Sequence, residues 1–183
     1  MSLYRMFDAA YPPQQPYPGC QAVAGYIGGN ALHVWTLDEW LRFSGLVQFP
    51  IWVGFAEDDP AGHGQQCAAA MHALGWRPFD RNRRGVILDE ETQVDAAWVD
   101  AFAAQIWQAG YQTFMYGSLA TILQNPPKEG YLVADWTGVP TIPPYANVIG
   151  TQYQPNVPWE GTSVDLSVIT DTMLVHGGQG PRG

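Results

Sequence analysis

Positive charge is scarce in this chain of 183 residues. Lysine and arginine together number only 8, against 17 aspartate and glutamate residues, so the formal net charge is −9. Charged residues make up 14% of the chain, whereas about 25% is usual for a globular domain. An acidic surface repels phosphate backbones, anionic lipids and anionic wall polymers. We therefore expect no nucleic-acid partner.

Long apolar runs are also missing. None approaches the roughly 20 residues that a bilayer-spanning helix needs, so we expect no membrane insertion. The first residues are too few and too polar to read as a secretory signal, which predicts synthesis in the cytoplasm with release by lysis, or association with a phage. Residues 1–175 are expected to form one domain, and the glycine-rich residues 176–183 a flexible tail.

Motifs for metals, nucleotides and serine nucleophiles are absent as well. The two cysteines, Cys20 and Cys67, are far apart and lack metal-ligand spacing, so we expect free thiols. The four histidines form neither an HExxH motif nor an i, i+4 pair, which predicts no metal site. Ser118 has no GxSxG context, and Gly28-Gly29 is not part of a GxGxxG motif. We expect no cofactor.

Short apolar runs, each closed by turn or polar residues, recur through the chain. Hydrophobic residues make up 46% of it, enough for a sizeable core. Eight strands are predicted, over residues 4–8, 22–27, 50–55, 85–88, 111–116, 131–135, 148–153 and 163–168. Helices are predicted over residues 62–74, 95–109 and 118–123, and a capping box, Thr36-Leu37-Asp38-Glu39, marks the start of another.

The order of these elements predicts the fold class. Strands alternate with helices in the first two thirds of the chain, and this alternation favours a parallel sheet. Eight strands favour closure of the sheet, although the chain is shorter than the roughly 200 residues of the smallest eightfold barrels. We therefore predict an α/β fold, a compact and irregular (β/α) TIM-like barrel with helices missing toward the C-terminus.

Acidic residues stand at the ends of several predicted strands. They are Asp8 on the first strand, Asp89 and Glu91 after the fourth, Asp135 on the sixth and Asp165 on the eighth. In a parallel barrel the carboxyl ends of the strands open onto one face, where active sites collect. The five carboxyl groups would then converge. Asp8, Asp135 and Asp165, each taken alone, more often cap a helix or satisfy a loop turn.

Asp89 and Glu91 are two residues apart, so on an extended strand their side chains point to the same side and Glu90 points to the other. Like charges in a confined site cannot all ionise, so one carboxyl group keeps its proton beside an ionised partner. Cleavage of a glycosidic bond needs this pair, an acid for the leaving oxygen and a carboxylate at the sugar carbon.

Aromatic residues lie at the same strand ends. They are Tyr26, Tyr116, Trp136 and Tyr153. Flat aromatic faces stack on sugar rings, and they also pack cores, so composition alone does not choose between these uses. Together with the acids they predict the walls of a sugar-binding cleft.

Short motifs in this order resemble those of glycoside hydrolase family 25 lysozymes. They are Phe7-Asp8, Val86-Ile87-Leu88-Asp89-Glu90-Glu91, Tyr116-Gly117-Ser118, Leu132-Val133-Ala134-Asp135-Trp136, Gly150-Thr151-Gln152-Tyr153 and Ser163-Val164-Asp165-Leu166. The segment Ala24-Gly25-Tyr26-Ile27-Gly28-Gly29 also resembles the related actinobacterial glycoside hydrolase-like domain, the domain of unknown function 1906. The order is collinear over nearly the whole chain.

The resemblance implies an irregular (β/α) barrel that cleaves the β-1,4 bond between N-acetylmuramic acid and N-acetylglucosamine in peptidoglycan. It implies that Glu91 is the general acid and that Asp89 is the second carboxylate or positions the substrate's N-acetyl group. Asp8 and Asp165 would complete the acidic floor. The candidate substrate-binding residues are Tyr26, Tyr116, Asp135, Trp136, Gln152 and Tyr153.

A second interpretation stays open. The chain would then be a non-catalytic barrel that binds peptidoglycan or another glycan, or a structural part of a phage particle or secretion apparatus. Turnover of purified peptidoglycan distinguishes the two interpretations, because only an enzyme releases new reducing ends.

Overall fold

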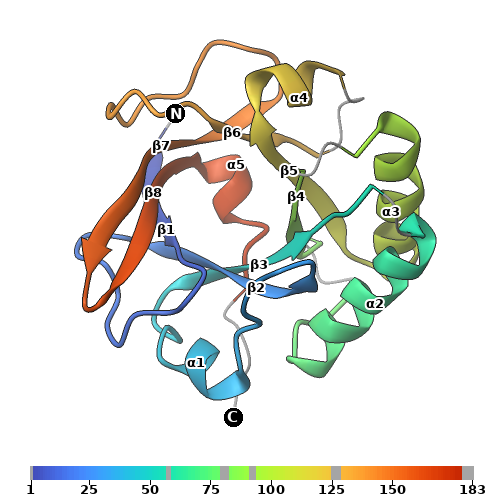
Figure 1. The fold of residues 1–183 in the computed structure, drawn as a ribbon, viewed down its shortest axis with the longest axis horizontal. Coiled ribbons are helices and arrows are strands. Elements are labelled where there is room, and N and C mark those ends of the chain that lie inside the picture. Colours follow the sequence, from blue (N-terminus) through green and yellow to red (C-terminus); the bar gives the residue numbers. More distant parts are fainter. Residues whose placement is uncertain (1, 57–58, 79–82, 91–93, 125–128, 179–183) are drawn as a thin grey trace.

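The computed structural model is a closed barrel of eight strands with short helices around it (Figure 1). It describes residues 2–56, 59–78, 83–90, 94–124 and 129–178. The strands are β1 (Leu3–Asp8), β2 (Ala22–Gly29), β3 (Val47–Val53), β4 (Gly85–Asp89), β5 (Gln112–Ser118), β6 (Tyr131–Ala134), β7 (Val148–Trp159) and β8 (Thr162–Thr170). The helices are α1 (Leu37–Leu41), α2 (Pro60–Ala73), α3 (Ala96–Gln108), α4 (Leu119–Gln124) and α5 (Asp171–Leu174). The predicted TIM-like barrel is confirmed.

One strand runs against the others. Strands β1 to β7 pair in parallel in sequence order, whereas β8 is antiparallel to both β7 and β1. Only Glu160 and Gly161 separate β7 from β8, and both have positive φ, at 46° and 82°. A parallel crossover needs about a dozen residues, so a connection this short makes a hairpin. The predicted parallel sheet is therefore wrong for β8.

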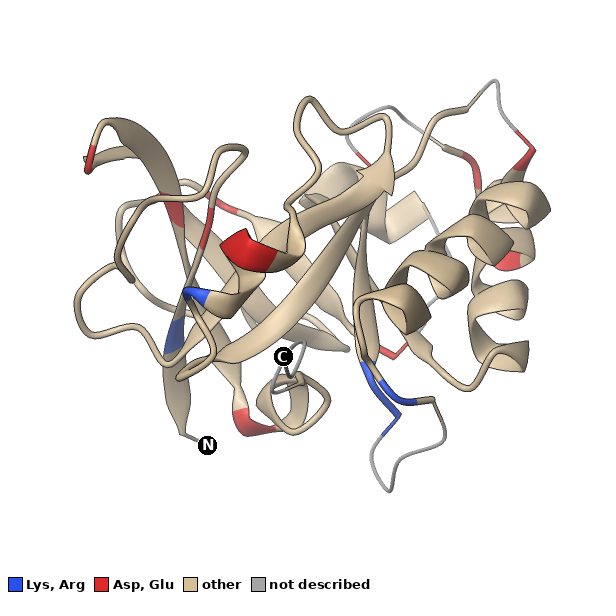
Figure 2. Cartoon of the chain, turned by 90° about the horizontal axis from the view of Figure 1, so that it is seen from below, with Lys and Arg blue, Asp and Glu red and all other residues tan. Residues whose placement is uncertain are grey.

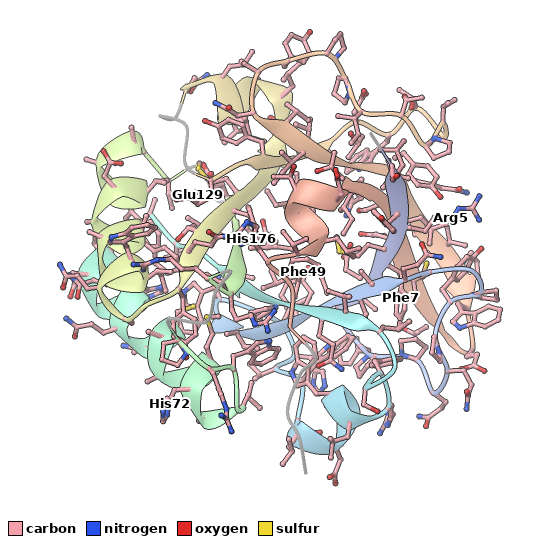
Figure 3. The ribbon with its side chains drawn as sticks, turned by 180° about the vertical axis from the view of Figure 1, so that it is seen from behind. Arg5, Phe7, Phe49, His72, Glu129 and His176 are labelled. Carbon is pink, nitrogen blue, oxygen red and sulfur yellow. The ribbon has the colours of Figure 1, made fainter. Side chains whose placement is uncertain are left out.

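Apolar side chains fill the inside of the barrel. The inner cluster consists of Met6, Ala22, Ala24, Phe49, Ile51, Ile87, Phe114, Tyr116, Leu132, Ile169 and Met173. Met173 belongs to α5, which follows β8 and so lies at the end of the barrel where β1 begins (Figure 1). Figure 3 shows this end, with Phe49 and His176 beside the helix. The helix closes this end, which leaves the other end for a site.

The chain stays packed after α5. The carbonyl of His176 accepts a hydrogen bond from the Gly85 N–H at 2.9 Å. Gly178 and Gln48 exchange two backbone hydrogen bonds, at 2.7 and 2.9 Å. Residues 176–178, which the composition placed in a flexible tail, thus lie against β3 and β4, while residues 179–183 lie outside the described residues.

Helices cover the barrel unevenly. Figure 1 shows α2 and α3 side by side against one flank, with α1 and α4 at its two sides. Within the described residues no helix lies between β6 and β8, which agrees with the predicted loss of helices toward the C-terminus. The β1–β2 loop packs against the β7–β8 hairpin instead, where Tyr17 meets Trp159 edge-on at 5.2 Å between ring centroids. No described helix is long and apolar enough to cross a bilayer.

The predicted capping box is present at the start of α1. The Thr36 hydroxyl accepts from the Glu39 N–H at 3.3 Å, and the Glu39 carboxylate accepts from the Thr36 N–H at 2.7 Å. This reciprocal pair satisfies two backbone donors that the helix itself leaves open. It fixes the segment that follows β2, which lies at the open end of the barrel.

Candidate active site

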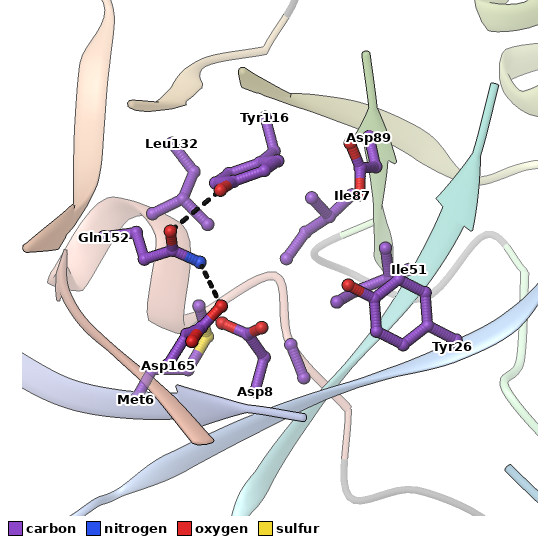
Figure 4. Close-up of a pocket in the computed structure, with 11 residues that line it drawn as sticks. Met6, Asp8, Tyr26, Ile51, Ile87, Asp89, Tyr116, Leu132, Gln152 and Asp165 are labelled. Atoms are coloured by element: carbon purple, nitrogen blue, oxygen red, sulfur yellow. Dashed lines mark hydrogen bonds between the residues drawn. The ribbon is translucent and has the colours of Figure 1, made fainter. Parts of the chain in front are cut away.

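Three of the predicted acids, Asp8, Asp89 and Asp165, line one pocket (Figure 4). Asp8 is the last residue of β1 and Asp89 the last of β4. Asp165 lies near the start of β8, and because β8 is antiparallel this start lies at the same end of the barrel, opposite Asp8 in the register. Asp8 and Asp89 are buried, with 7% and 5% of their surface exposed. Segments far apart in sequence thus bring three carboxyl groups together.

The pocket has a volume of about 110 Å³. Its lining consists of Met6, Asp8, Ala24, Tyr26, Ile51, Ile87, Asp89, Tyr116, Leu132, Gln152 and Asp165. Pockets that enclose a whole small molecule usually measure roughly 300–1,000 Å³. This one therefore has room for one ring edge or one substituent, and a longer ligand would extend over the rim.

The apolar part of the lining was not predicted as part of the site. It consists of Met6, Ala24, Ile51, Ile87 and Leu132. The period of two along a strand could have identified three of these residues, because Met6, Ala24 and Ile87 each stand two positions before a predicted site residue. The floor of the pocket is thus apolar and its acids stand nearer the strand ends.

Gln152 on β7 connects several predicted site residues. Its Oε1 accepts from the Tyr116 hydroxyl at 2.8 Å and from the Trp136 Nε1–H at 2.9 Å. Its Nε2 donates to Oδ2 of Asp165 at 3.2 Å. Figure 4 shows the amide between Tyr116 and Asp165. Tyr116 and Gln152, both predicted to bind substrate, therefore line the pocket and contact one another.

Trp136 lies at the rim and not in the lining. It stands two residues after the end of β6, and 62% of its surface is exposed although its ring nitrogen is bonded to Gln152. Tyr26, on β2, lies across the pocket and is part of the lining (Figure 4). Of the predicted aromatic residues, Tyr26 and Tyr116 line the pocket and Trp136 lies at its rim.

Two other predicted contacts lie elsewhere. Tyr153 is buried in the layer outside the barrel, because it follows Gln152 on the strand and so points to the opposite face. Burial there raises the pKa of Tyr153. Asp135 is exposed and does not line the pocket; its N–H donates to the Gln152 carbonyl at 3.0 Å. Neither side chain lines the pocket that contains Asp8, Asp89 and Asp165.

The predicted general acid, Glu91, falls in residues 91–93, outside the described residues. Its neighbour Glu90 is fully buried and is not part of the pocket lining. The charge of Glu90 contributes, after burial, to the raised pKa of Tyr131, a residue of the outer layer. Glu90 thus lies on the opposite side of the strand from Asp89, as the alternation predicts.

Asp165 titrates unusually. Burial raises its pKa, and the hydrogen bond that Oδ1 accepts from the Asn156 N–H, at 2.6 Å, lowers it in part. Asn156 has a φ of 57°, at an irregularity of β7 that turns its N–H toward this carboxylate. The net shift favours a proton on Asp165 to a higher pH than usual, beside the carboxyl group of Asp8.

The Asp165→Asn variant is expected to gain stability relative to the wild type as the pH rises. A raised pKa means that the folded state holds its proton more tightly, so this stabilisation is present at low pH and is lost as the pH rises through the folded-state pKa. Asparagine does not titrate, so the variant does not lose this stabilisation as the pH rises. Urea unfolding of both proteins from pH 3 to pH 7 measures the difference. If the free energy of unfolding of the variant relative to the wild type stays constant or falls as the pH rises, the raised pKa of Asp165 is contradicted.

The described residues contain no group of three histidine, cysteine or acidic side chains placed to hold a metal ion. A larger cavity, of about 290 Å³, lies on the flank formed by α3 and the beginning of β5. Its lining is Asp100, Ala103, Ala104, Trp107, Gln112, Thr113 and Glu129, none of which the motifs identify. The smaller pocket is the better candidate because strand ends gather its acids and aromatic rings.

Comparison with known proteins places this geometry in a fold. No protein-family model and no curated protein matches the chain. Its structure is similar to that of an uncharacterized B. stearothermophilus protein, with a TM-score of 0.70 and 20% identity over 96% of this chain and 100% of that chain. It is also similar to the bacterial lysozyme from Streptomyces coelicolor, with a TM-score of 0.51 and 15% identity over 84% of this chain and 83% of that chain. At such identities the likeness shows the fold alone.

Proposed function

We propose that this chain is a glycoside hydrolase that cleaves the β-1,4 bond of peptidoglycan glycan strands, as an N-acetylmuramidase. The observation that carries the proposal is the convergence of Asp8, Asp89 and Asp165 in one pocket, which Tyr26 and Tyr116 also line and beside which Trp136 is exposed. Carboxyl groups in a confined site and flat apolar faces suit glycoside cleavage. The fold it shares with a bacterial lysozyme adds support.

The roles follow from the sequence motif and the pocket. Glu91 acts as the general acid, which gives a proton to the leaving sugar oxygen. Asp89 is the second carboxylate, which stabilises the positive charge at the sugar carbon or positions the N-acetyl group. Asp8 and Asp165 line the pocket with Asp89 and keep the local field negative, which favours a protonated acid next to an ionised partner.

Trp136→Ala is expected to weaken binding of a soluble peptidoglycan oligosaccharide about tenfold, because the exposed ring gives a sugar an apolar face worth about 1.4 kcal/mol. Isothermal titration calorimetry measures the change. Trp107→Ala is the matched control, since Trp107 is similarly exposed, at 51%, on α3 and away from the pocket. Equal affinities for the Trp136 variant and the wild type would remove Trp136 from the sugar site.

The decisive experiment is incubation of the purified protein with purified peptidoglycan, with new reducing ends counted and products identified by mass spectrometry. A muramidase leaves N-acetylmuramic acid at the reducing end. Products with N-acetylglucosamine at the reducing end would mean that the protein cleaves the other glycosidic bond of the strand and is not a muramidase. Binding without any products, over a broad pH range, would contradict the enzyme and favour the non-catalytic barrel.

A further inference from the structure

Gln152 has almost no hydrogen-bonding capacity left for a ligand. A glutamine side chain has two acceptor positions and two N–H donors. The Tyr116 hydroxyl and the Trp136 ring N–H occupy both acceptor positions, and Asp165 takes one donor. With 3% of its surface exposed, Gln152 contacts mainly protein. This arrangement differs from that of a residue whose main task is to bind substrate.

The partners also fix which way the amide faces. An indole N–H donates only, so Oε1 must face Trp136 and Nε2 must face Asp165. A reversed amide would bring the Trp136 N–H against an N–H and the Asp165 carboxylate against a carbonyl oxygen. The orientation of Asp165 is thus linked to the position of Trp136 through one planar group.

The four residues come from four parts of the barrel. Tyr116 is on β5, Trp136 follows β6, Gln152 is on β7 and Asp165 is on β8. The Trp136 ring is mostly exposed, so packing holds it weakly and the bond to Gln152 ties it to the barrel. Asp165 is tied twice, to Gln152 and to the Asn156 N–H.

We propose that Gln152 is a positioning residue that holds the Trp136 ring and the Asp165 carboxyl group in a fixed relation, so that a sugar stacked on the rim is aligned with the acids in the pocket. This inference rests on the proposed function for the alignment of a sugar and for its kinetic consequence. The mechanical link between the two side chains is a property of the protein without substrate, so it is testable whether or not the protein cleaves glycan.

Two single variants distinguish the hydrogen bond to Trp136 from the hydrogen bond to Asp165. In Gln152→Glu the carboxylate still accepts from Tyr116 and Trp136, but it no longer donates to Asp165 and it adds a negative charge beside it. In Gln152→Leu all three hydrogen bonds are lost. The Trp136 ring should stay in place in the first variant and become loose in the second.

A double variant restores the hydrogen bond between positions 152 and 165 with donor and acceptor exchanged. In Gln152→Glu combined with Asp165→Asn, the new amide donates to the new carboxylate, and its oxygen still accepts from the Asn156 N–H. We expect this double variant to fold like the wild type and to keep the Trp136 ring nitrogen bonded. It serves as the rescue of Gln152→Glu, and if Gln152→Leu does not fold these two variants still test the bond between positions 152 and 165.

The test is NMR of the free protein. Exchange of the Trp136 indole hydrogen with solvent, assigned with Trp136→Phe, should accelerate at least tenfold in Gln152→Leu and stay near the wild-type rate in Gln152→Glu and in the double variant. The Asp165 carboxyl carbon should titrate at higher pH in Gln152→Glu than in the wild type. The ionisable groups that face it in the pocket are Asp8, Asp89, Tyr26 and Tyr116, and their titrations are followed in the same spectra.

The outcomes are distinct. Unchanged indole exchange in Gln152→Leu, or an unchanged Asp165 titration in Gln152→Glu, overturns the positioning role whatever the activity. If the protein cleaves glycan, Gln152→Leu should raise KM and lower kcat, each about fivefold or more, and Gln152→Glu should lower kcat with little change in KM. If it cleaves none, the proposed function fails while the NMR result still decides this inference.

Discussion

Asp89→Asn is expected to lower kcat for peptidoglycan cleavage by about 1,000-fold, in the range that a positioned catalytic carboxylate contributes. Asparagine has nearly the same shape, so the loss reports the charge. The backbone at this position is fixed on both sides, because Asp89 pairs with Val53 of β3 and with Tyr116 of β5. Its carbonyl also accepts from the Gly54 N–H at 3.0 Å. A change of charge here therefore leaves the strand in place.

The measurement is the initial rate of reducing-end release, with circular dichroism and thermal unfolding to show that the variant is folded. Asp38→Asn is the matched control, because Asp38 is exposed on α1 and outside the pocket. It should keep the wild-type rate. Wild-type activity in Asp89→Asn would exclude Asp89 from the chemistry and, with it, the role given to the pocket.

A companion variant, Glu91→Gln, separates the two carboxyl roles. A general acid matters less when the leaving group is a weak base that departs without a proton. Glu91→Gln should therefore be nearly inactive on peptidoglycan but recover much of its rate on an aryl glycoside of the same sugars with an acidic phenol. Asp89→Asn should be slow on both substrates. The opposite pattern would exchange the two assignments.

The positions of Asp8 and Asp89 could be predicted because they depend on local rules, whereas Asp135, predicted in the same way, does not line the pocket. An apolar run that ends in Asp8 or Asp89 predicts a strand whose last side chain stands at the rim, and closure of the barrel brings such ends together. Asp165 was expected near the others for the wrong reason. It lies there because β8 is antiparallel, which places the beginning of β8 beside the end of β1.

The direction of β8 leaves no trace in the hydrophobic pattern, since alternation is the same in either direction. The length of the connection does carry the information. The predicted strands, 148–153 and 163–168, leave only residues 154–162 between them, fewer than the dozen or so that a parallel crossover needs, and this clue was available in the sequence.

Which face a side chain occupies was harder to predict. Gln152 and Tyr153 stand next to each other, and only one of the two points into the barrel. The choice depends on the register of β7, which is irregular between Gln152 and Gln154. Likewise, Trp136 reaches Gln152 across 16 positions of sequence, and this contact depends on the pairing of β6 with β7, which places Ala134 beside Gln152.

Trp35→Ala is expected to lower the free energy of unfolding by about 3–5 kcal/mol, the usual cost of removing a buried indole. Trp35 is 1% exposed and lies between other rings, at 4.9 Å from Trp40 and 5.4 Å from Phe43 between centroids. It also packs so closely on Gly25 that a Cβ there would lie 2.6 Å from the indole. Alanine would leave a cavity that these rings cannot fill.

The same residue supports the pocket. The Trp35 indole N–H donates to the carbonyl of Ala9, next to Asp8, at 3.1 Å, and its backbone N–H donates to the carbonyl of Tyr26 at 2.9 Å. Loss of the ring should therefore loosen two sides of the site as well as the core. A chain of this size changes its Tm by roughly 2–4 °C per kcal/mol, so the expected fall is about 10 °C.

Thermal and urea unfolding of three tryptophan variants distinguish support from substrate contact. Trp35→Phe keeps an aromatic ring but loses the bond to Ala9, so its Tm should fall between those of the wild type and Trp35→Ala. Trp136→Ala should lose less than about 1 kcal/mol, because its ring is 62% exposed, yet it should bind oligosaccharide more weakly. We expect Trp35→Ala to unfold at a lower temperature than Trp136→Ala. If the two variants unfold at the same temperature, burial of Trp35 does not stabilise the barrel more than the exposed Trp136 ring does, and the distinction between a supporting and a substrate-contacting tryptophan is wrong.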